Sequence, residues 1–174
     1  MQDNTPILVG VAAFQQKNPD FNEALEPIAI MERALRDAAD DAGHPQLLAR
    51  ADQILVPKGI WEYSDPGSLL ATALGAESAT SVLAEIGVSQ QTLLTRACQQ
   101  ISSGEAQVVL VTGAEAKYRA LCAAKAGAEA SETPQEGVEP DVMLMPEAEI
   151  WSEVESAGDV QLLTNPVCSA RCYP

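Results

Sequence analysis

Four short apolar runs, separated by stretches long enough to form helices, constrain the fold more than any other feature of the chain. The runs are Pro6–Phe14, Asp52–Pro57, Ala79–Ile86 and Gln107–Thr112. Runs that are apolar on both faces are typical of strands in a parallel sheet that helices cover on both sides. Parallel strands also need long crossovers, which helices provide. The pattern predicts an α/β domain of order β-α-β-α-β-α-β with a mostly parallel central sheet covered by helices.

The stretches between the runs have the spacing of amphipathic helices. Pro27 stands where a first helical turn tolerates proline, and the apolar residues after it recur on one face as far as Gly43, the expected stop. Further helices are expected over Ser68–Leu74, Ser89–Ser103 and Ala116–Ala126.

Charge divides the chain into two parts. Residues 1–125 carry fifteen acidic and nine basic side chains, whereas residues 126–160 carry ten acidic side chains and no Lys or Arg. We interpret the acidic, proline-punctuated stretch Gly127–Pro146 as an irregular, solvated excursion. Because nucleic-acid binding needs a basic surface, the net charge of −15 argues against a nucleic-acid partner.

The chain shows no signal for export or for membrane insertion. Its start, MQDNTPILVG, has no basic region followed by a long apolar segment, and no apolar run approaches the ~18 residues of a membrane span. Cys98 and Cys122 fall within helical patterns rather than in a spaced disulfide framework. We therefore expect a cytoplasmic protein without a membrane partner.

Three segments taken together resemble the thiolase-like superfamily, which includes acetyl-CoA acetyltransferases. They are the opening TPILVGVAAF, the stretch YSDPGSLLATALGA (Tyr63–Ala76) and the stretch GEAQVVLVTGAEA (Gly104–Ala116). In the last of these a helix ends in glycine, a buried strand follows, and a Gly-x-Glu turn closes it. The resemblance implies the N-terminal half of a two-half subunit. It divides the chain into an α/β domain (5–126), the acidic start of the family's loop region (127–158) and a tail that no longer matches (159–174).

The resemblance also implies acyl transfer between coenzyme A thioesters, with a coenzyme A thioester as substrate and no tightly bound cofactor. In the family a cysteine at the N-terminus of a buried helix becomes acylated, since a helix N-terminus lowers the pKa of a thiol. Counting back from Gly104 by the family's usual helix length places that nucleophile at Gly87, which has no side chain. The other catalytic residues of the family come from its C-terminal half. We therefore expect an acyltransferase homologue that is catalytically incompetent as this chain.

Gly87, Ser89 and Gln90, at the N-terminus of that helix, are the candidate substrate-binding residues, and no residue is assigned as catalytic. Ser89 has no adjacent base in the sequence, and we expect it to cap the helix. We expect Cys98 to be a buried core thiol, because it falls on the apolar face. Glu115, in the Gly-x-Glu turn, is expected to be a structural carboxylate that accepts hydrogen bonds.

Metal and dinucleotide sites are not expected. The one histidine, His44, lies in a loop after the first helix, and Cys168 and Cys172 lie four apart. A tetrahedral zinc site needs four ligands, which these residues do not supply. A dinucleotide fingerprint needs G-x-G-x-x-G after the first strand, and the residues at 10–14 do not match it.

The helix over Ser89–Ser103 indicates that the chain has a partner, because in the family this helix is buried between two sheets. In one half alone its apolar face lacks a cover, which predicts a homo-oligomer or a partner subunit over this helical layer. Three functions stay open. The chain is an acyltransferase subunit completed by a partner or by a longer native chain, a non-catalytic acyl-CoA-binding or protein-interaction module, or a truncated fragment without a function of its own.

Overall fold

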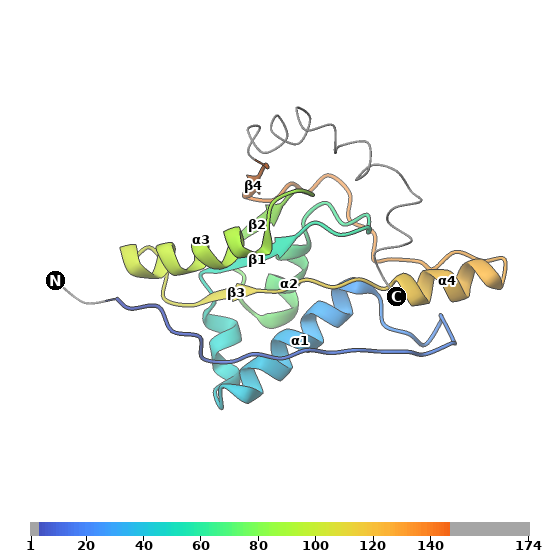
Figure 1. Ribbon diagram of the computed structural model, residues 1–174, viewed down its shortest axis with the longest axis horizontal. Coiled ribbons are helices and arrows are strands. Elements are labelled where there is room, and N and C mark those ends of the chain that lie inside the picture. The colour runs from blue at the N-terminus through green and yellow to red at the C-terminus, as the bar shows by residue number, and fades with distance from the viewer. Residues whose placement is uncertain (1–3, 147–174) are drawn as a thin grey trace, which may run out of the picture.

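The computed structural model describes residues 4–146 and shows a sheet of four parallel strands with helices on both faces (Figure 1). The strands are β1 (Gln53–Pro57), β2 (Thr80–Ala84), β3 (Val109–Val111) and β4 (Val142–Leu144). They lie in the order β3-β1-β2-β4, and each neighbouring pair is parallel. The predicted α/β class with a parallel central sheet is confirmed.

The strand register aligns side chains into rows that point to one face of the sheet. Leu55 of β1 lies opposite Val82 and Val111, and Val82 lies opposite Val142. Because successive strand residues alternate between faces, Ile54 points the other way. Ile54 and Leu55 are both fully buried. The central strands are therefore covered on both faces, as their apolar sequences predict.

Two helices and a short 3-10 helix cover one face of the sheet. They are α1 (Pro27–Asp41), η1 (Pro45–Arg50) and α2 (Pro66–Leu74). The helix α1 begins at Pro27 as predicted, whereas α2 begins two residues before its predicted start because Asp65 caps it through Ser68 N. These elements enclose the main core, which has fourteen buried apolar residues.

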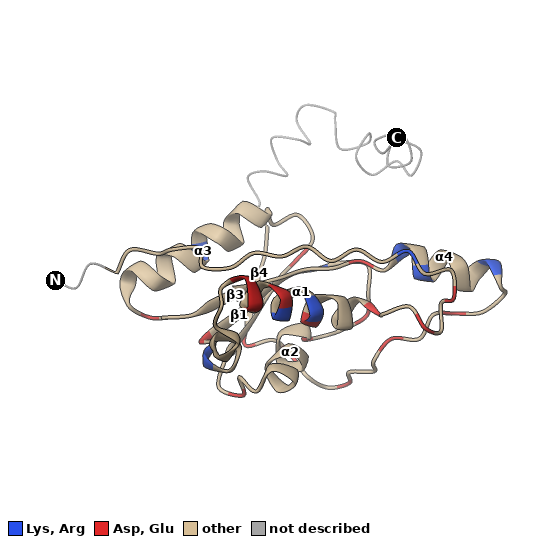
Figure 2. Ribbon diagram, turned by 90° about the horizontal axis from the view of Figure 1, so that it is seen from below, with Lys and Arg blue, Asp and Glu red and all other residues tan. Residues whose placement is uncertain are grey.

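One helix, α3 (Gln90–Ser103), covers the opposite face (Figures 1 and 2). Leu93 is the only residue of α3 that is buried. The core on this side has four buried residues: Leu55, Val82, Ala84 and Leu93. The last helix within residues 4–146, α4 (Lys117–Lys125), lies beyond the end of the sheet (Figure 1). None of the helices within residues 4–146 is both long and apolar enough to cross a membrane.

The predicted first strand, Pro6–Phe14, is wrong. The segment pairs with no strand among the described residues. Instead it lies against α1, where the Val11 amide donates a hydrogen bond to Asp41 Oδ2 (3.0 Å) and Gly10 packs tightly on the Ala38 carbonyl. Contacts with α1 therefore replace sheet pairing. Its large apolar side chains are consequently exposed: Ile7 (73%), Leu8 (83%), Val9 (55%) and Val11 (68%).

Two other strand predictions also need correction. The stretch Gly127–Pro146, predicted to be irregular, contains β4, whose three residues are too few to show a period in the sequence. The strand β3, predicted from a run that is apolar on both faces to be covered on both sides, lies at an edge of the sheet among the described residues, and its three residues are all half-buried. Residues 147–158 of the predicted excursion, and the predicted tail 159–174, lie outside the described residues.

Residues 128–141, which we call the acidic strap, cross the loop between β1 and α2. The Gln135 side chain accepts a hydrogen bond from Asp65 N (2.7 Å) and donates one to Asp65 O (2.8 Å). Farther along, Asp141 Oδ2 accepts a hydrogen bond from Ser81 N (2.8 Å). No residue of the strap is fully buried. Polar contacts, rather than apolar burial, hold the strap in place.

Candidate functional site

The turn between β2 and α3 contains the predicted nucleophile position. The Val88 amide donates a hydrogen bond to the Glu85 carbonyl (3.0 Å), which closes a four-residue turn. Gly87, at the third position, has a φ of +105°. A turn with positive φ at this position favours glycine, since other residues rarely adopt that conformation. The backbone conformation of the turn thus explains why a glycine stands here.

The next two predicted residues begin α3. Ser89 is the N-cap, and its Oγ accepts a hydrogen bond from Thr92 N (3.2 Å) and lies 2.9 Å from Thr92 Oγ1. The predicted helix cap is confirmed. Gln90 is the first helical residue and is exposed. Within residues 4–146, no His, Asp or Glu side chain makes a hydrogen bond with the Ser89 hydroxyl, so no base is placed to activate it.

Two further predictions for this region have opposite outcomes. The predicted buried thiol is wrong, because Cys98 is exposed. The helix α3 turns Leu93 toward the sheet, and Cys98 faces outward. The structural interpretation of Glu115 is confirmed, since its Oε1 accepts a hydrogen bond from Ile60 N (2.8 Å) and so joins the turn after β3 to the loop after β1.

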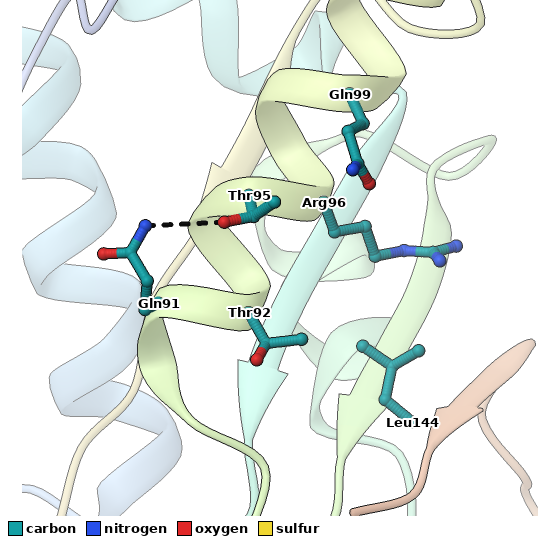
Figure 3. Close-up of a pocket in the computed structure, with 6 residues that line it drawn as sticks. All are labelled: Gln91, Thr92, Thr95, Arg96, Gln99 and Leu144. Carbon is teal, nitrogen blue, oxygen red and sulfur yellow. Dashed lines mark hydrogen bonds between the residues drawn. The ribbon is translucent and has the colours of Figure 1, made fainter. Parts of the chain in front are cut away.

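A hollow of about 360 Å³ lies along the outer side of α3, next to β4 (Figure 3). Five polar side chains and one leucine line it: Gln91, Thr92, Thr95, Arg96, Gln99 and Leu144. The Gln91 amide donates a hydrogen bond to Thr95 Oγ1 (3.4 Å) across one side of it. The hollow adjoins the predicted site but does not include Gly87, Ser89 or Gln90.

Arg96 gives this hollow its chemical character. It is the only Lys or Arg between residues 59 and 116, and its Nε is buried without a hydrogen-bond partner among the described residues. A buried donor that lacks a partner costs about 1–3 kcal/mol. A guanidinium binds carboxylate and phosphate groups through several donors. The hollow therefore suits an anionic group. The signal in the sequence is a single arginine within an otherwise uncharged helix.

A second hollow, of about 280 Å³, lies among the loop after β1, the start of α4 and the acidic strap. Its lining combines charged and apolar side chains, among them Ile60, Glu115, Arg119 and Glu132. The Arg119 guanidinium donates hydrogen bonds to the carbonyls of Phe21 (3.0 Å) and Ser131 (2.8 Å). Arg119 is thus occupied in joining three segments of the chain.

Tyr63 lies in the loop after β1 and is 1% exposed. Its hydroxyl donates a hydrogen bond to Glu26 Oε2 (2.9 Å). Burial, together with this hydrogen bond, raises the pKa of Tyr63 above its ordinary value of about 10. Trp61 is also buried, and the two ring centroids lie 5.3 Å apart. Both rings therefore belong to the core and are not available to stack on a ligand.

The residues weighed as metal ligands do not come together in the described part of the chain. His44 is exposed and precedes η1. Within residues 4–146 no group of three or more His, Cys, Asp or Glu side chains is arranged to hold a metal ion. Cys168 and Cys172 lie outside the described residues.

Comparisons with known proteins show a likeness in structure. No protein-family model matches the sequence, and no curated protein matches it significantly. Among solved structures, the fold is similar to that of a monomeric SCP2-thiolase-like protein, type 1, from Mycobacterium smegmatis, with a TM-score of 0.53 and 26% sequence identity. The similarity covers 66% of this chain and 24% of that chain, so it spans about a quarter of the other protein. The chain has the fold of a thiolase-like domain, as the resemblance in its sequence predicts.

Proposed function

We propose that this chain is a thiolase-like homologue of acyl-CoA acyltransferases that binds an acyl thioester without forming an acyl-enzyme on its own side chains. Gly87 is the observation that carries the proposal. It stands at the position expected for the nucleophile, has no side chain, and has a backbone conformation that favours glycine. The likeness in fold to an SCP2-thiolase-like protein supports the choice of an acyl thioester as ligand.

The absence of a side chain at Gly87 matters because covalent acyl transfer needs an activated nucleophile. Ser89 is the nearest hydroxyl, and it is engaged with Thr92 as a helix cap. The exposed thiol of Cys98 is more than two helical turns farther along α3. It lacks the helix N-terminus that would lower its pKa toward that of a reactive thiolate.

The first turns of α3 support binding of an anionic ligand. The N-terminus of a helix has a partial positive charge, and Arg96 adds a full one seven residues after Ser89. Residues seven apart lie on the same side of a helix, about 10 Å from each other. An acyl thioester with a phosphorylated carrier has several anionic groups, and these suit both the N-terminus of α3 and the Arg96 guanidinium. The coenzyme A thioester is therefore the ligand to test.

A second candidate function, association with a partner subunit, is favoured by the outer face of α3. Leu94 is 47% exposed there, and the neighbouring Cys98 is also exposed. Arg96 is the only charged residue in the helix. We propose that a further thiolase-like unit, from a longer chain or a partner, covers this face. Burial of Leu94 in a complex would favour this function.

Calorimetric titration of the full chain with acetyl-CoA, followed by intact-mass analysis, tests the leading proposal. We expect saturable binding, no acetylated protein and no release of free coenzyme A. Arg96→Gln should weaken binding several-fold, whereas Arg33→Gln should not, because Arg33 pairs with Asp37 on the opposite side of the sheet. Turnover would contradict the non-covalent mechanism. A lack of saturable binding would contradict the binding function.

A thiol placed at the predicted nucleophile position tests the assignment of Gly87. We expect Gly87→Cys to react with acetyl-CoA faster than the wild-type chain, because its sulfur would lie next to the N-terminus of α3. Gly43→Cys is the matched control, since Gly43 also has a positive φ, of 70°, but follows α1. Equal acetylation of the two variants would contradict the assignment.

A further inference from the structure

The N-terminal segment, residues 4–16, pairs with no strand among the described residues, yet its second half has the alternating exposure of a strand. From residue 10 onward, half-buried and exposed positions alternate. Gly10 faces α1, and the Phe14 ring lies 5.5 Å from the Arg33 guanidinium. The residues on the other side form an outward row: Ile7, Val9, Val11 and Ala13.

The composition of the outward row is unusual for an exposed position. The solvent-facing side of an extended segment is normally polar. Here it is apolar, and Ile7, Val9 and Val11 are 73%, 55% and 68% exposed, with the adjacent Leu8 at 83%. Ile7, Val9, Val11 and Ala13 together expose roughly 400 Å², which is the size of the largest apolar patch on a typical monomer, and such patches often have a function.

Contacts at both ends of the segment fix the direction of the row. Asn4 lies beside Gly104 at the end of α3, and the Val11 amide donates a hydrogen bond to Asp41 Oδ2 on α1. Gly10 fits against the Ala38 carbonyl so closely that a Cβ would clash. The segment therefore cannot turn over to bury the row without breaking these contacts. The row is preformed for a partner.

Charge identifies the kind of partner. The protein has a net charge of −15, and two copies repel each other over most of their surface. The thirteen residues from Asn4 to Gln16 contain no charged side chain. Figure 2 shows acidic and basic residues gathered on α1, α4 and the loops, whereas the N-terminal segment carries none. A second copy therefore meets less repulsion at this segment than over the charged parts of the surface.

We propose that the outward row packs against the same row of a second copy across a two-fold axis. Such a contact is self-complementary, as two-fold interfaces are. The β-branched side chains of Ile7, Val9 and Val11 suit a flat packing surface. This contact lies on a different surface from the proposed partner surface on α3. The similar solved structure is of a protein described as monomeric.

The area predicts a weak interface. Two copies would bury roughly 800 Å² through these rows, which is below the ~1,200 Å² of stable complexes and within the range of weak, transient contacts. We therefore expect a dimer that forms reversibly as the protein concentration rises.

Sedimentation velocity of the full chain over a range of concentrations tests the proposal. The wild type should shift from monomer to dimer, and Val9→Asp and Ile7→Asp should each weaken dimerisation at least tenfold by placing like charges in contact. Leu121→Asp, on α4, is the matched control because Leu121 is 50% exposed, and it should dimerise like the wild type. Far-UV circular dichroism checks that each variant folds. If either Val9→Asp or Ile7→Asp does not fold, the variant that folds provides the test of dimerisation.

Three results would overturn the proposal. A wild-type chain that stays monomeric at every concentration means that residues outside 4–146, or no partner, cover the row. A dimer that survives both row substitutions means that it forms elsewhere. A dimer lost in Leu94→Asp, but kept in Val9→Asp, assigns the contact to α3 instead.

Discussion

The two faces of the sheet are closed by very different means. On the face that α1 and α2 cover, fourteen apolar residues are buried, and the rings of Trp61 and Tyr63 are among them. On the face that α3 covers, the core has four buried residues, and Leu93 is the only one from the helix. Both faces belong to the same strands, so the difference comes from the helices.

The composition of α3 explains the difference. Its sequence, QQTLLTRACQQISS, has glutamine, threonine and serine at most positions and only a few large apolar side chains. The helix therefore reaches the sheet through one row and presents polar groups elsewhere. The face that α1 and α2 cover, which we call the closed face, supplies stability. The face that α3 covers, which we call the open face, has the turn at Gly87, the Arg96 hollow and the exposed Leu94. Candidate functions accordingly gather on the less stable side.

Truncation of a core leucine on each face tests this contrast most strongly. Leu70 and Leu93 are both fully buried. We expect Leu70→Ala to lower the free energy of unfolding by about 3–4 kcal/mol, because the crowded core around it cannot collapse into the cavity. Leu93→Ala should cost about 2–3 kcal/mol, since α3 can move inward. Urea denaturation measures both, and an equal or reversed order would contradict the contrast.

The two helix caps give the next largest difference. Asp65 is 2% exposed, caps α2 through Ser68 N (3.1 Å) and accepts a hydrogen bond from Ser81 Oγ (3.0 Å). Ser89 caps α3 at an exposed position. Asp65→Ala should cost about 2–3 kcal/mol, because it leaves the Ser68 amide unpaired and removes one of the two acceptors of the Ser81 hydroxyl. Ser89→Ala should cost about 1 kcal/mol. If urea denaturation shows that the two variants lose the same free energy of unfolding, the burial of Asp65 does not make its cap more stabilising than that of Ser89.

Alkaline pH should destabilise the protein through Tyr63, which lies in the core that α1 and α2 cover. The raised pKa of Tyr63 means that the unfolded chain releases this proton near pH 10 while the folded chain keeps it. The stabilisation is therefore fully present below pH 10 and is lost as pH rises above it, by up to about 1.4 kcal/mol per pH unit. Tyr63→Phe should remove this part of the pH dependence. An identical slope in denaturation from pH 9 to 11 for both proteins would refute the assignment.

Prediction from the sequence succeeded where local signals and tertiary contacts agree. Pro27 fixed the start of α1, and Ser89 and Gly104 bound α3 at its two ends. The buried strand β1 was found within one residue of its start, because its apolar run is short and has helical stretches on both sides.

Prediction failed where similar composition meets different tertiary surroundings. Residues 6–14 are as apolar as β1, yet a hydrogen bond from Val11 to Asp41 holds them on α1. Periodicity placed Cys98 on the apolar face of its helix, but that face is wider than the part that reaches the sheet. The Arg96 hollow depends on the nearness of β4, which leaves no period in the sequence.

The smallest expected effect is on the open face. Leu94 is a large apolar residue in a helix, but it is 47% exposed. We expect Leu94→Ala to change the free energy of unfolding by less than about 0.5 kcal/mol, as surface substitutions usually do. A cost above about 2 kcal/mol in urea denaturation would show that Leu94 is buried in the assembled protein. That result would support a covering partner and weaken the contrast between the faces.

The attachment of the acidic strap has a consequence for how a protease meets this protein. Thr133 is tied to Glu26 through its amide and its hydroxyl, and Gln135 is tied to Asp65, but no strap residue is fully buried. A segment held by hydrogen bonds alone opens at a lower free energy than the sheet beneath it. Among the glutamates of residues 4–146, a protease specific for glutamate should therefore cut first at Glu129 or Glu136, in the native state. The nick would release the strand β4 from its tether while the fourteen-residue core stays intact.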